Sequence, residues 1–373
     1  MIKVICVCGA RPNFMKIAPL VHALKRDDNF TILLVHTGQH YDDTMSRQFF
    51  DDLDIPKPDI NLGVGSGSHA VQTATIMTRF EPVVRDYQPD FVIVVGDVNS
   101  TIACGIVAAK LGVKLVHIEA GQRSFDRMMP EEINRILTDA ISDLLFVSEP
   151  SGLEILKKEG IPQGKVFYVG NIMIDTLLEN RQRAQRSTIL NTLGLRNKDY
   201  ILMTLHRPGN VDNPEIFGGI LSALEEIQKN DVVVFPIHPS TRANIEKTND
   251  YDRMRNMPNL KMLDPLGYLD FLCLIDNAKL VLTDSGGIQA ETTTLRVPCM
   301  TVRETTEWPI TLTQGTNHLV PPARDGIISA FKKIMQLADH RTYPLPDLCD
   351  GKTADRIVKI LHESMDTPTI SRS

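Results

Sequence analysis

Short apolar segments rich in β-branched residues recur along the first half of the chain, with helical patterns between them. Segments that are apolar throughout, without alternating polarity, are typical of parallel strands buried on both faces of a sheet. Strands are predicted at Ile2–Val7, Thr31–His36, Phe91–Val95, Lys114–Ile118, Leu144–Val147 and Val166–Val169. Helical patterns such as Ala18–Lys25 and Ala103–Lys110 separate them. The pattern predicts a doubly wound α/β unit.

The same alternation begins again in the second half of the chain. Further strands are predicted at Tyr200–Leu205, Val232–Ile237, Leu260–Leu263, Leu280–Thr283 and Pro298–Val302. Asn213 and Pro214 predict a helix start, because Asn caps helices well and Pro suits the first helical position. We therefore predict an α/β fold of two doubly wound Rossmann-like domains facing a central cleft. The expected boundaries are 1–169 for the N-terminal domain, 170–352 for the C-terminal domain and 353–373 for a final segment.

Composition narrows the class of protein. A length of 373 residues fits two domains. A net charge of −6 argues against a groove that binds nucleic acid. Any anionic ligand would therefore have to be bound by local basic residues. No apolar run is long enough to cross a membrane, and no signal peptide is evident. The six cysteines show neither a pairing framework nor metal-ligand spacing. We expect a reduced, cytoplasmic protein without a metal site.

Acidic side chains come directly after two of the predicted strands. In open α/β sheets ligands bind beyond the carboxyl ends of the strands, which is where Asp97 and Glu119 stand. Each also has a structural explanation. Asp97 could cap the following helix, and Glu119 could form a salt bridge to Arg123 or Arg135.

Charged residues also lie near the starts of two predicted helices. Arg11 and Lys16 follow the first strand, and cations near a helix N-terminus oppose its dipole. The pair therefore suggests an anionic ligand, although two solvated surface charges are the alternative. Glu131 and Glu132 begin another helix, where acids suit the dipole whatever their function. We expect one of these two carboxylates to be structural.

In the second half, polar and small residues follow three predicted strands. His206 and His238 each come at a strand end, and Asp284-Ser285-Gly286-Gly287 follows another. Small residues between a strand and a helix let backbone N–H groups face a phosphate. Glu291, about one turn later, could accept both hydroxyls of a ribose. A plain glycine-containing loop is the alternative. Taken together, the basic groups, the carboxylates and this loop favour a nucleotide-diphosphate sugar as ligand. The sequence has no G-x-S-x-G motif, so acyl transfer has no support.

These motifs make the chain resemble the non-hydrolysing UDP-N-acetylglucosamine (UDP-GlcNAc) 2-epimerases. The likeness rests on Gly9-Ala10-Arg11-Pro12 with Lys16, Gly96-Asp97, Glu119-Ala120-Gly121-x-Arg123, Pro130-Glu131-Glu132-Ile133-Asn134-Arg135, His206-Arg207 and Asp284-Ser285-Gly286-Gly287-Ile288-Gln289-x-Glu291. The resemblance implies the B-type glycosyltransferase fold. It also implies a closing helix, Thr353–Ser364, that crosses back to the N-terminal domain before a disordered tail.

The resemblance further implies reversible inversion of C2 without a cofactor. UDP leaves C1 as a proton leaves C2, giving 2-acetamidoglucal, and UDP then adds back with a proton on the other face. By motif match, Asp97, Glu119 and Glu131 would be the acids and bases, and His206, Arg11 and Lys16 would hold the diphosphate. Ser285, Gly286 and Gly287 would donate backbone N–H groups to it, Glu291 would hold the ribose, and Phe271 would lie near the uracil. Gln39 and His238 would belong to a regulatory UDP-sugar site.

Some positions depart from the family pattern. Trp308 stands where an arginine usually contacts the nucleotide, Gln122 replaces a leucine, Ala140 stands where many members have histidine, and the spacer Ser124–Met129 is short. The alternatives therefore include a hydrolysing 2-epimerase, an epimerase of a UDP-2,3-diacetamido sugar acid, a UDP-sugar glycosyltransferase and a non-catalytic sensor. A homodimer is expected, with no nucleic-acid or membrane partner.

Overall fold

The chain forms two compact units in a computed structural model that describes residues 1–9, 11–38, 53–55, 57–237, 239–248, 250–337 and 344–366. Unit 1 comprises Met1–Glu179 and Asp347–Ser373, and unit 2 comprises Asn180–Pro346. The first division lies inside helix α7 (Ile172–Ala184), later than the expected start of the second domain at residue 170. The first half of α7 groups with unit 1, where its Thr176 hydroxyl donates to the Met15 carbonyl.

Unit 1 is built on a parallel sheet in the order β3-β2-β1-β4-β5-β6-β7. Its strands are β1 (Ile2–Cys8), β2 (Phe30–His36), β3 (Ile60–Asn61), β4 (Phe91–Val95), β5 (Lys114–Ala120), β6 (Leu144–Val147) and β7 (Val166–Tyr168). The central strands β1 and β4 are almost wholly buried, as their apolar sequences predict.

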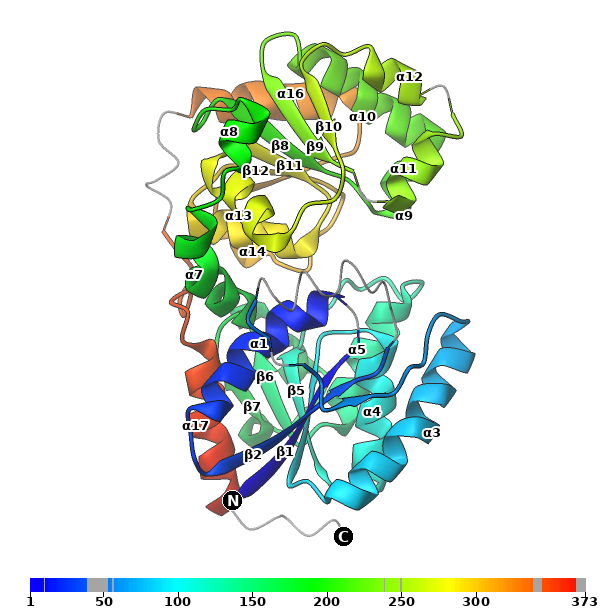
Figure 1. Ribbon diagram of the computed structural model, residues 1–373, viewed down its shortest axis with the longest axis vertical. Coiled ribbons are helices and arrows are strands. Elements are labelled where there is room, and N and C mark those ends of the chain that lie inside the picture. The colour runs from blue at the N-terminus through cyan, green and yellow to red at the C-terminus, as the bar shows by residue number, and fades with distance from the viewer. Residues whose placement is uncertain are drawn as a thin grey trace. The chain divides into compact units, whose positions relative to one another are not determined.

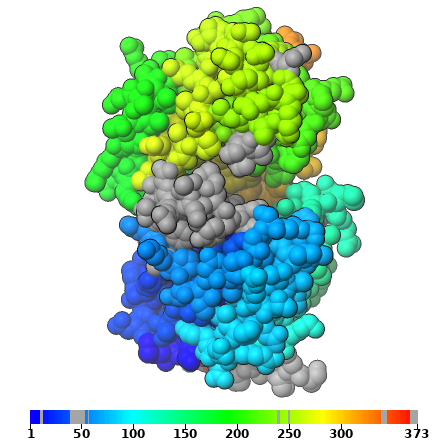
Figure 2. Space-filling view, turned by 45° about the vertical axis from the view of Figure 1, so that its right-hand side comes forward, coloured from blue at the N-terminus to red at the C-terminus, as the bar shows by residue number. Residues whose placement is uncertain are grey.

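Helices complete unit 1. They are α1 (Arg11–Lys25), α3 (His69–Tyr87), α4 (Asn99–Lys110), α5 (Pro130–Ile141), α6 (Pro150–Lys158), the 3₁₀ turn η1 (Gln163–Lys165), the first part of α7, and α17 (Thr353–Asp366). Ile76, Phe80 and Val84 on one face of α3 pack with Val92 and Val94 of β4 in one core cluster. The other face of α3 forms part of the outer surface, in light blue in Figure 2.

The C-terminal helix α17 belongs to unit 1 and lies beside α1 (Figure 1). The buried carboxylate of Asp175 in α7 accepts the Ala354 N–H at 2.7 Å, at the start of α17. Near its other end, His362 pairs with Asp27 at 2.6 Å. These contacts attach residues distant in sequence to the first sheet.

Unit 2 has a parallel sheet in the order β10-β9-β8-β11-β12-β13. Its strands are β8 (Tyr200–Thr204), β9 (Val232–Pro236), β10 (Leu260–Leu263), β11 (Leu280–Thr283), β12 (Cys299–Val302) and β13 (Asn317–Val320). Its helices are α8 (Ile189–Leu193), α9 (Pro208–Val211), α10 (Pro214–Ile227), α11 (Pro239–Ile245), α12 (Asp250–Arg255), α13 (Tyr268–Asn277), α14 (Gly286–Leu295), α15 (Ile310–Thr313) and α16 (Arg324–Gln336). Asn213 caps α10 through its side chain, as predicted.

Both sheets confirm the predicted doubly wound α/β class. In each, the strand order reverses direction beside the first strand, between β1 and β4 in unit 1 and between β8 and β11 in unit 2. Such a switch point is where ligands of doubly wound sheets bind, just beyond the strand ends. Asp97, His206 and Asp284 stand directly beyond these strands. Within the described ranges no helix is long and apolar enough to cross a membrane.

Candidate active site

Glu119 has an unusual backbone conformation. It lies within β5, which extends further than predicted, and the register of β5 against β6 shifts between Ile118 and Ala120. Its φ of 71° is in the left-handed region, which costs a residue with a side chain roughly 1–3 kcal/mol. The residue is 4% exposed. The bulge therefore places the buried Glu119 side chain at the C-terminal end of β5.

The Glu119 carboxylate forms an ion pair with Lys16 of α1. Both groups lie over Gly96, where an added Cβ would stand 3.2 Å from Lys16 Nζ and 3.5 Å from Glu119 Oε2. The salt bridge to Arg123 or Arg135 that the sequence allowed is therefore replaced by one to Lys16. The second oxygen, Oε1, is buried without a hydrogen-bond partner among the described residues. Glu119 thus retains a free acceptor.

Asp97 is held by Arg135 and does not cap a helix. The N-cap of α4 is Val98, while Asp97 Oδ2 accepts from Arg135 Nη2 at 2.6 Å and Nε at 3.0 Å. Its carboxylate is partly exposed, with 28% of the side-chain surface accessible. The Asp97 carboxyl group is thus fixed in direction by Arg135 and remains partly accessible to solvent.

Of the two glutamates that begin α5, Glu132 is the structural one. Its carboxylate accepts the N–H groups of Ser124 and Phe125, each at 2.9 Å, and Arg135 Nη1 at 2.7 Å. Burial alone would raise the pKa of Glu132, but these hydrogen bonds hold it below its ordinary value. Glu131, by contrast, is half-buried.

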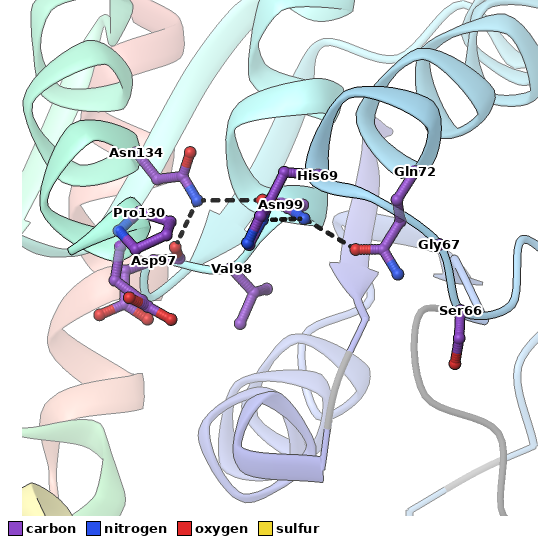
Figure 3. A pocket seen from close by; sticks show the side chains of 10 residues that line it. Ser66, Gly67, His69, Gln72, Asp97, Val98, Asn99, Pro130 and Asn134 are labelled. Carbon is purple, nitrogen blue, oxygen red and sulfur yellow. Dashed lines mark hydrogen bonds between the residues drawn. The ribbon is translucent and has the colours of Figure 1, made fainter. Parts of the chain in front are cut away.

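Asp97 and Glu131 line one pocket of about 240 Å³ in unit 1. The remaining wall is polar: Asn134 Nδ2 donates to the Asp97 carbonyl at 2.8 Å, and Asn99 Nδ2 donates to Gln72 Oε1 at 2.8 Å. Figure 3 shows Asn134, Asn99 and Gln72 joined in one hydrogen-bonded row. The other lining residues are Ser66, Gly67, His69, Val98 and Pro130. The pocket offers two carboxylates and several amide groups to a polar ligand.

In unit 2, His206 is oriented by Asp284. Its Nδ1 lies 3.0 Å from Asp284 Oδ1, and nearly half of its side chain is exposed. Asp284 is fully buried and also accepts the backbone N–H of Arg207 at 2.9 Å. Burial alone would raise the pKa of Asp284, but the hydrogen bond and charge of His206 hold it below its ordinary value. An imidazole turned in this way can present its other nitrogen to an anion.

The start of α14 provides backbone donors beside these groups. Gly286 and Gly287 occupy its first turn, where N–H groups have no intrahelical acceptor. The Ser285 N–H is already used, because it donates to Thr283 Oγ1 at 3.0 Å. A Cβ on Gly286 would lie 3.5 Å from the Trp308 indole nitrogen, so the indole packs against this turn. Further along α14, burial raises the pKa of Glu291 to about 8.

Comparison with known proteins identifies the family. Residues 22–362 match the family model described as UDP-N-acetylglucosamine 2-epimerase. The chain belongs to this family. It is 42% identical over 361 residues to a UDP-N-acetylglucosamine 2-epimerase homolog of Methanococcus maripaludis, covering 96% of this chain and 99% of that protein. It is also 42% identical over 334 residues to the UDP-2,3-diacetamido-2,3-dideoxy-D-glucuronate 2-epimerase of Pseudomonas aeruginosa, covering 88% and 91%.

A solved structure agrees over the whole fold. The Methanocaldococcus jannaschii UDP-GlcNAc 2-epimerase in complex with UDP-GlcNAc and UDP is 39% identical, with a TM-score of 0.89, covering 97% of this chain and 100% of that one. The resemblance stated from sequence motifs is thereby confirmed.

Three predicted site positions are described only in part or not at all. Arg11 begins α1, but its side chain is outside the described set. Gln39 and His238 lie outside the described residues altogether. Phe271 is half-buried in α13, the helix that also carries Tyr268.

Other residues of this 2-epimerase family member were not singled out from its sequence. Asn99 and Asn134 line the pocket with Asp97, and Asp284 orients His206. The signal for the first two was spacing, because Asn99 stands two positions after Asp97 and Asn134 one turn after Glu131. Nothing in the spacing showed that Asp284 would pair with His206, which follows β8, the neighbouring strand in the sheet.

Proposed function

We propose that this protein interconverts UDP-GlcNAc and UDP-N-acetylmannosamine by inverting C2 of the sugar. A base removes the C2 proton, the C2–H electron pair forms the C1–C2 double bond, and the C1–O bond breaks to release UDP. UDP then adds back at C1 while a proton reaches C2 on the opposite face. The two half-reactions balance without an oxidant or a reductant.

The observation that carries this proposal is Glu119. A carboxylate with one oxygen paired to Lys16 and the other buried without a partner can accept a proton in a site that excludes water. Its left-handed backbone is strained, and strain of this kind clusters at functional sites. Glu132, which holds the start of α5, has donors on both oxygens.

Asp97 and Glu131 are proposed as the other acid and base groups, because both line one pocket with accessible carboxylates. Two faces of the sugar need separate proton carriers, and a set of three carboxylates can supply them. Lys16, with Arg11 and His206, would neutralise the departing diphosphate. The family match over residues 22–362 includes Asp97, Glu119, Glu131 and His206 and supports the proposal there.

The UDP half of the substrate is proposed to bind unit 2. The free N–H groups of Gly286 and Gly287 suit phosphate oxygens, since a helix N-terminus favours anions. Glu291 would accept the ribose hydroxyls and Phe271 would lie near the uracil. Ser285 would contribute through its hydroxyl, since its N–H is engaged within the chain.

A second substrate is favoured by one observation. The Pseudomonas aeruginosa UDP-2,3-diacetamido-2,3-dideoxy-D-glucuronate 2-epimerase is as similar in identity as the Methanococcus maripaludis relative. Epimerisation of such a sugar acid would need the same C2 chemistry and the same UDP contacts. The two substrates differ only at C3 and C6.

Proton NMR in heavy water tests the proposal. Incubation with UDP-GlcNAc, and separately with the UDP-2,3-diacetamido sugar acid, should yield the C2 epimer with deuterium at C2 for the true substrate. Glu119→Gln should slow this by roughly 10²–10⁴-fold. Glu225→Gln, which alters only a partly exposed pair with Arg253, should leave turnover unchanged. Release of free sugar would instead identify a hydrolysing enzyme, and no deuterium incorporation with either substrate would refute epimerase activity.

We also propose a cytoplasmic homodimer, with Gln39 and His238 as candidates for a regulatory UDP-sugar site. The dimer is supported by exposed apolar side chains on and before α5, namely Phe125, Met128, Ile133 and Leu137. A surface of this kind is suited to a protein partner. Sedimentation velocity should show a dimer that Leu137→Glu converts to a monomer. A monomeric wild-type protein at micromolar concentration would contradict the proposal.

A further inference from the structure

A chain of buried polar groups lies behind the candidate carboxylates of unit 1. His117, Asp139 and Arg123 are 0%, 1% and 4% exposed. His117 Nδ1 lies 2.6 Å from Asp139 Oδ1, and Asp139 Oδ2 lies 2.7 Å from Arg123 Nη2. Arg123 continues to Glu159, the C-cap of α6, with bonds of 2.7 and 2.9 Å. None of these residues lines the pocket around Asp97.

The hydrogen-bond partners show which atoms face acceptors and which face donors in this buried network. His117 Nε2 lies 2.9 Å from the Gly96 carbonyl, which can only accept. Asp139 receives donors on both oxygens, since Oδ2 also accepts the Gly121 N–H at 3.0 Å. Burial alone would raise the pKa of Asp139, but His117 and Arg123 hold it below its ordinary value. With Asp139 ionised, both nitrogens of His117 face acceptors.

His117 and Asp139 contact the two turns that carry Asp97 and Glu119. The Gly96 carbonyl belongs to the left-handed residue just before Asp97. The Gly121 N–H belongs to the left-handed turn just after the Glu119 bulge, so one carboxylate and one imidazole join both turns. Gly121 packs closely against Gly152, because a Cβ there would stand 2.7 Å from the Gly152 carbonyl oxygen.

We propose that His117, Asp139 and Arg123 are positioning residues that hold Glu119 in its strained conformation and fix the Asp97 turn against it. The proposal rests on the proposed epimerase function for its kinetic test. A buried ion pair contributes little net stability, because removing the charges from water offsets their attraction. A network placed between the strained Glu119 bulge and the Gly96 turn is therefore explained by geometry, which small displacements of reacting groups would spoil.

Replacing Asp139 tests the proposal against a matched control. Asp139→Asn should lower kcat by about 10–100-fold while KM changes by less than about threefold, because the carboxylates shift but the UDP contacts do not. Asp143→Asn is the control, since Asp143 accepts the Leu115 N–H at 2.9 Å at the opposite end of the same strand. Equal kcat losses in the two variants at equal melting temperature, or a loss borne by KM, would overturn the proposal.

One measurement does not depend on activity. A crystal structure of Asp139→Asn should show Glu119 displaced from its left-handed conformation, whereas Asp143→Asn should retain it. A wild-type protein without epimerase activity but with this result would refute the proposed function and support the positioning role. An undisturbed Glu119 in Asp139→Asn would refute the positioning role even in an active epimerase.

Discussion

Glu291 is predicted to couple UDP binding to proton release. Its carboxyl group is buried in α14, and burial raises its pKa to about 8. In the ligand-free protein at pH 7 about nine-tenths of the molecules therefore carry the proton. A carboxylate that accepts two ribose hydroxyls has to be ionised, so binding should expel this proton.

The size of the effect follows from the pKa. Ionising Glu291 at pH 7 costs about 1.4 kcal/mol, one pKa unit, and this cost disappears above pH 8. UDP affinity should therefore rise roughly eightfold between pH 7 and pH 8.5, with about 0.9 proton released per UDP at pH 7. Glu291→Gln has no proton to lose at this position, so its affinity should be weaker and should lack this rise.

Isothermal titration calorimetry in two buffers of different ionisation heat measures the released protons. Glu291→Gln serves as the reference, because the phosphate groups of UDP contribute equally to both proteins. The difference between the two proton counts isolates Glu291. If wild type and Glu291→Gln release the same number of protons at pH 7, or their affinities change in parallel with pH, the ribose role of Glu291 is refuted.

Two further predictions concern stability. Burial raises the pKa of Asp175 to about 6, so its protonated form stabilises the fold, fully below pH 4 and less as the pH rises through 6. Asp175→Asn still accepts the Ala354 N–H. It should remove up to roughly 3 kcal/mol of the change in unfolding free energy between pH 4 and 7, measured by thermal unfolding. An unchanged slope would refute the assignment. Gly121→Ala should destabilise the protein by roughly 1–3 kcal/mol in urea unfolding, because the φ of Gly121 is 79° and the new Cβ would meet the Gly152 backbone. An unchanged free energy of unfolding would contradict this packing.

The sequence predicted the sheets well because their strands are buried on both faces. Each predicted strand is present, with its ends displaced by at most two residues. The strands that were missed have another composition. β3 has only two residues, and β13 begins with Asn317 and His318. Asn317 is nevertheless buried, because its amide donates to Gln289 at 2.9 Å, a compensation that hydrophobic pattern cannot reveal.

The sequence indicated which edge of each sheet carries the candidate site, but not the ion pairs within it. Polar residues beyond strand ends predict a ligand site at that edge, which parallel topology fixes. The ion-pair partners depend on three-dimensional packing. Lys16 pairs with Glu119 from a helix more than a hundred positions away in sequence, and Arg135 bridges Asp97 to Glu132. The sequence therefore allowed several partners for each carboxylate and could not choose among them.

The satisfaction of hydrogen bonds separates the carboxylates by role. Glu132 and Asp139 have donors on both oxygens, which hold their pKa values low and leave them poor bases. Glu119 is equally buried but keeps Oε1 without a donor among the described residues. An isolated acceptor in a dry site carries a free-energy penalty that only a ligand or a proton relieves. Residue type alone cannot make this distinction, and it is the physical reason for assigning proton transfer to Glu119 and a holding role to Glu132 and Asp139.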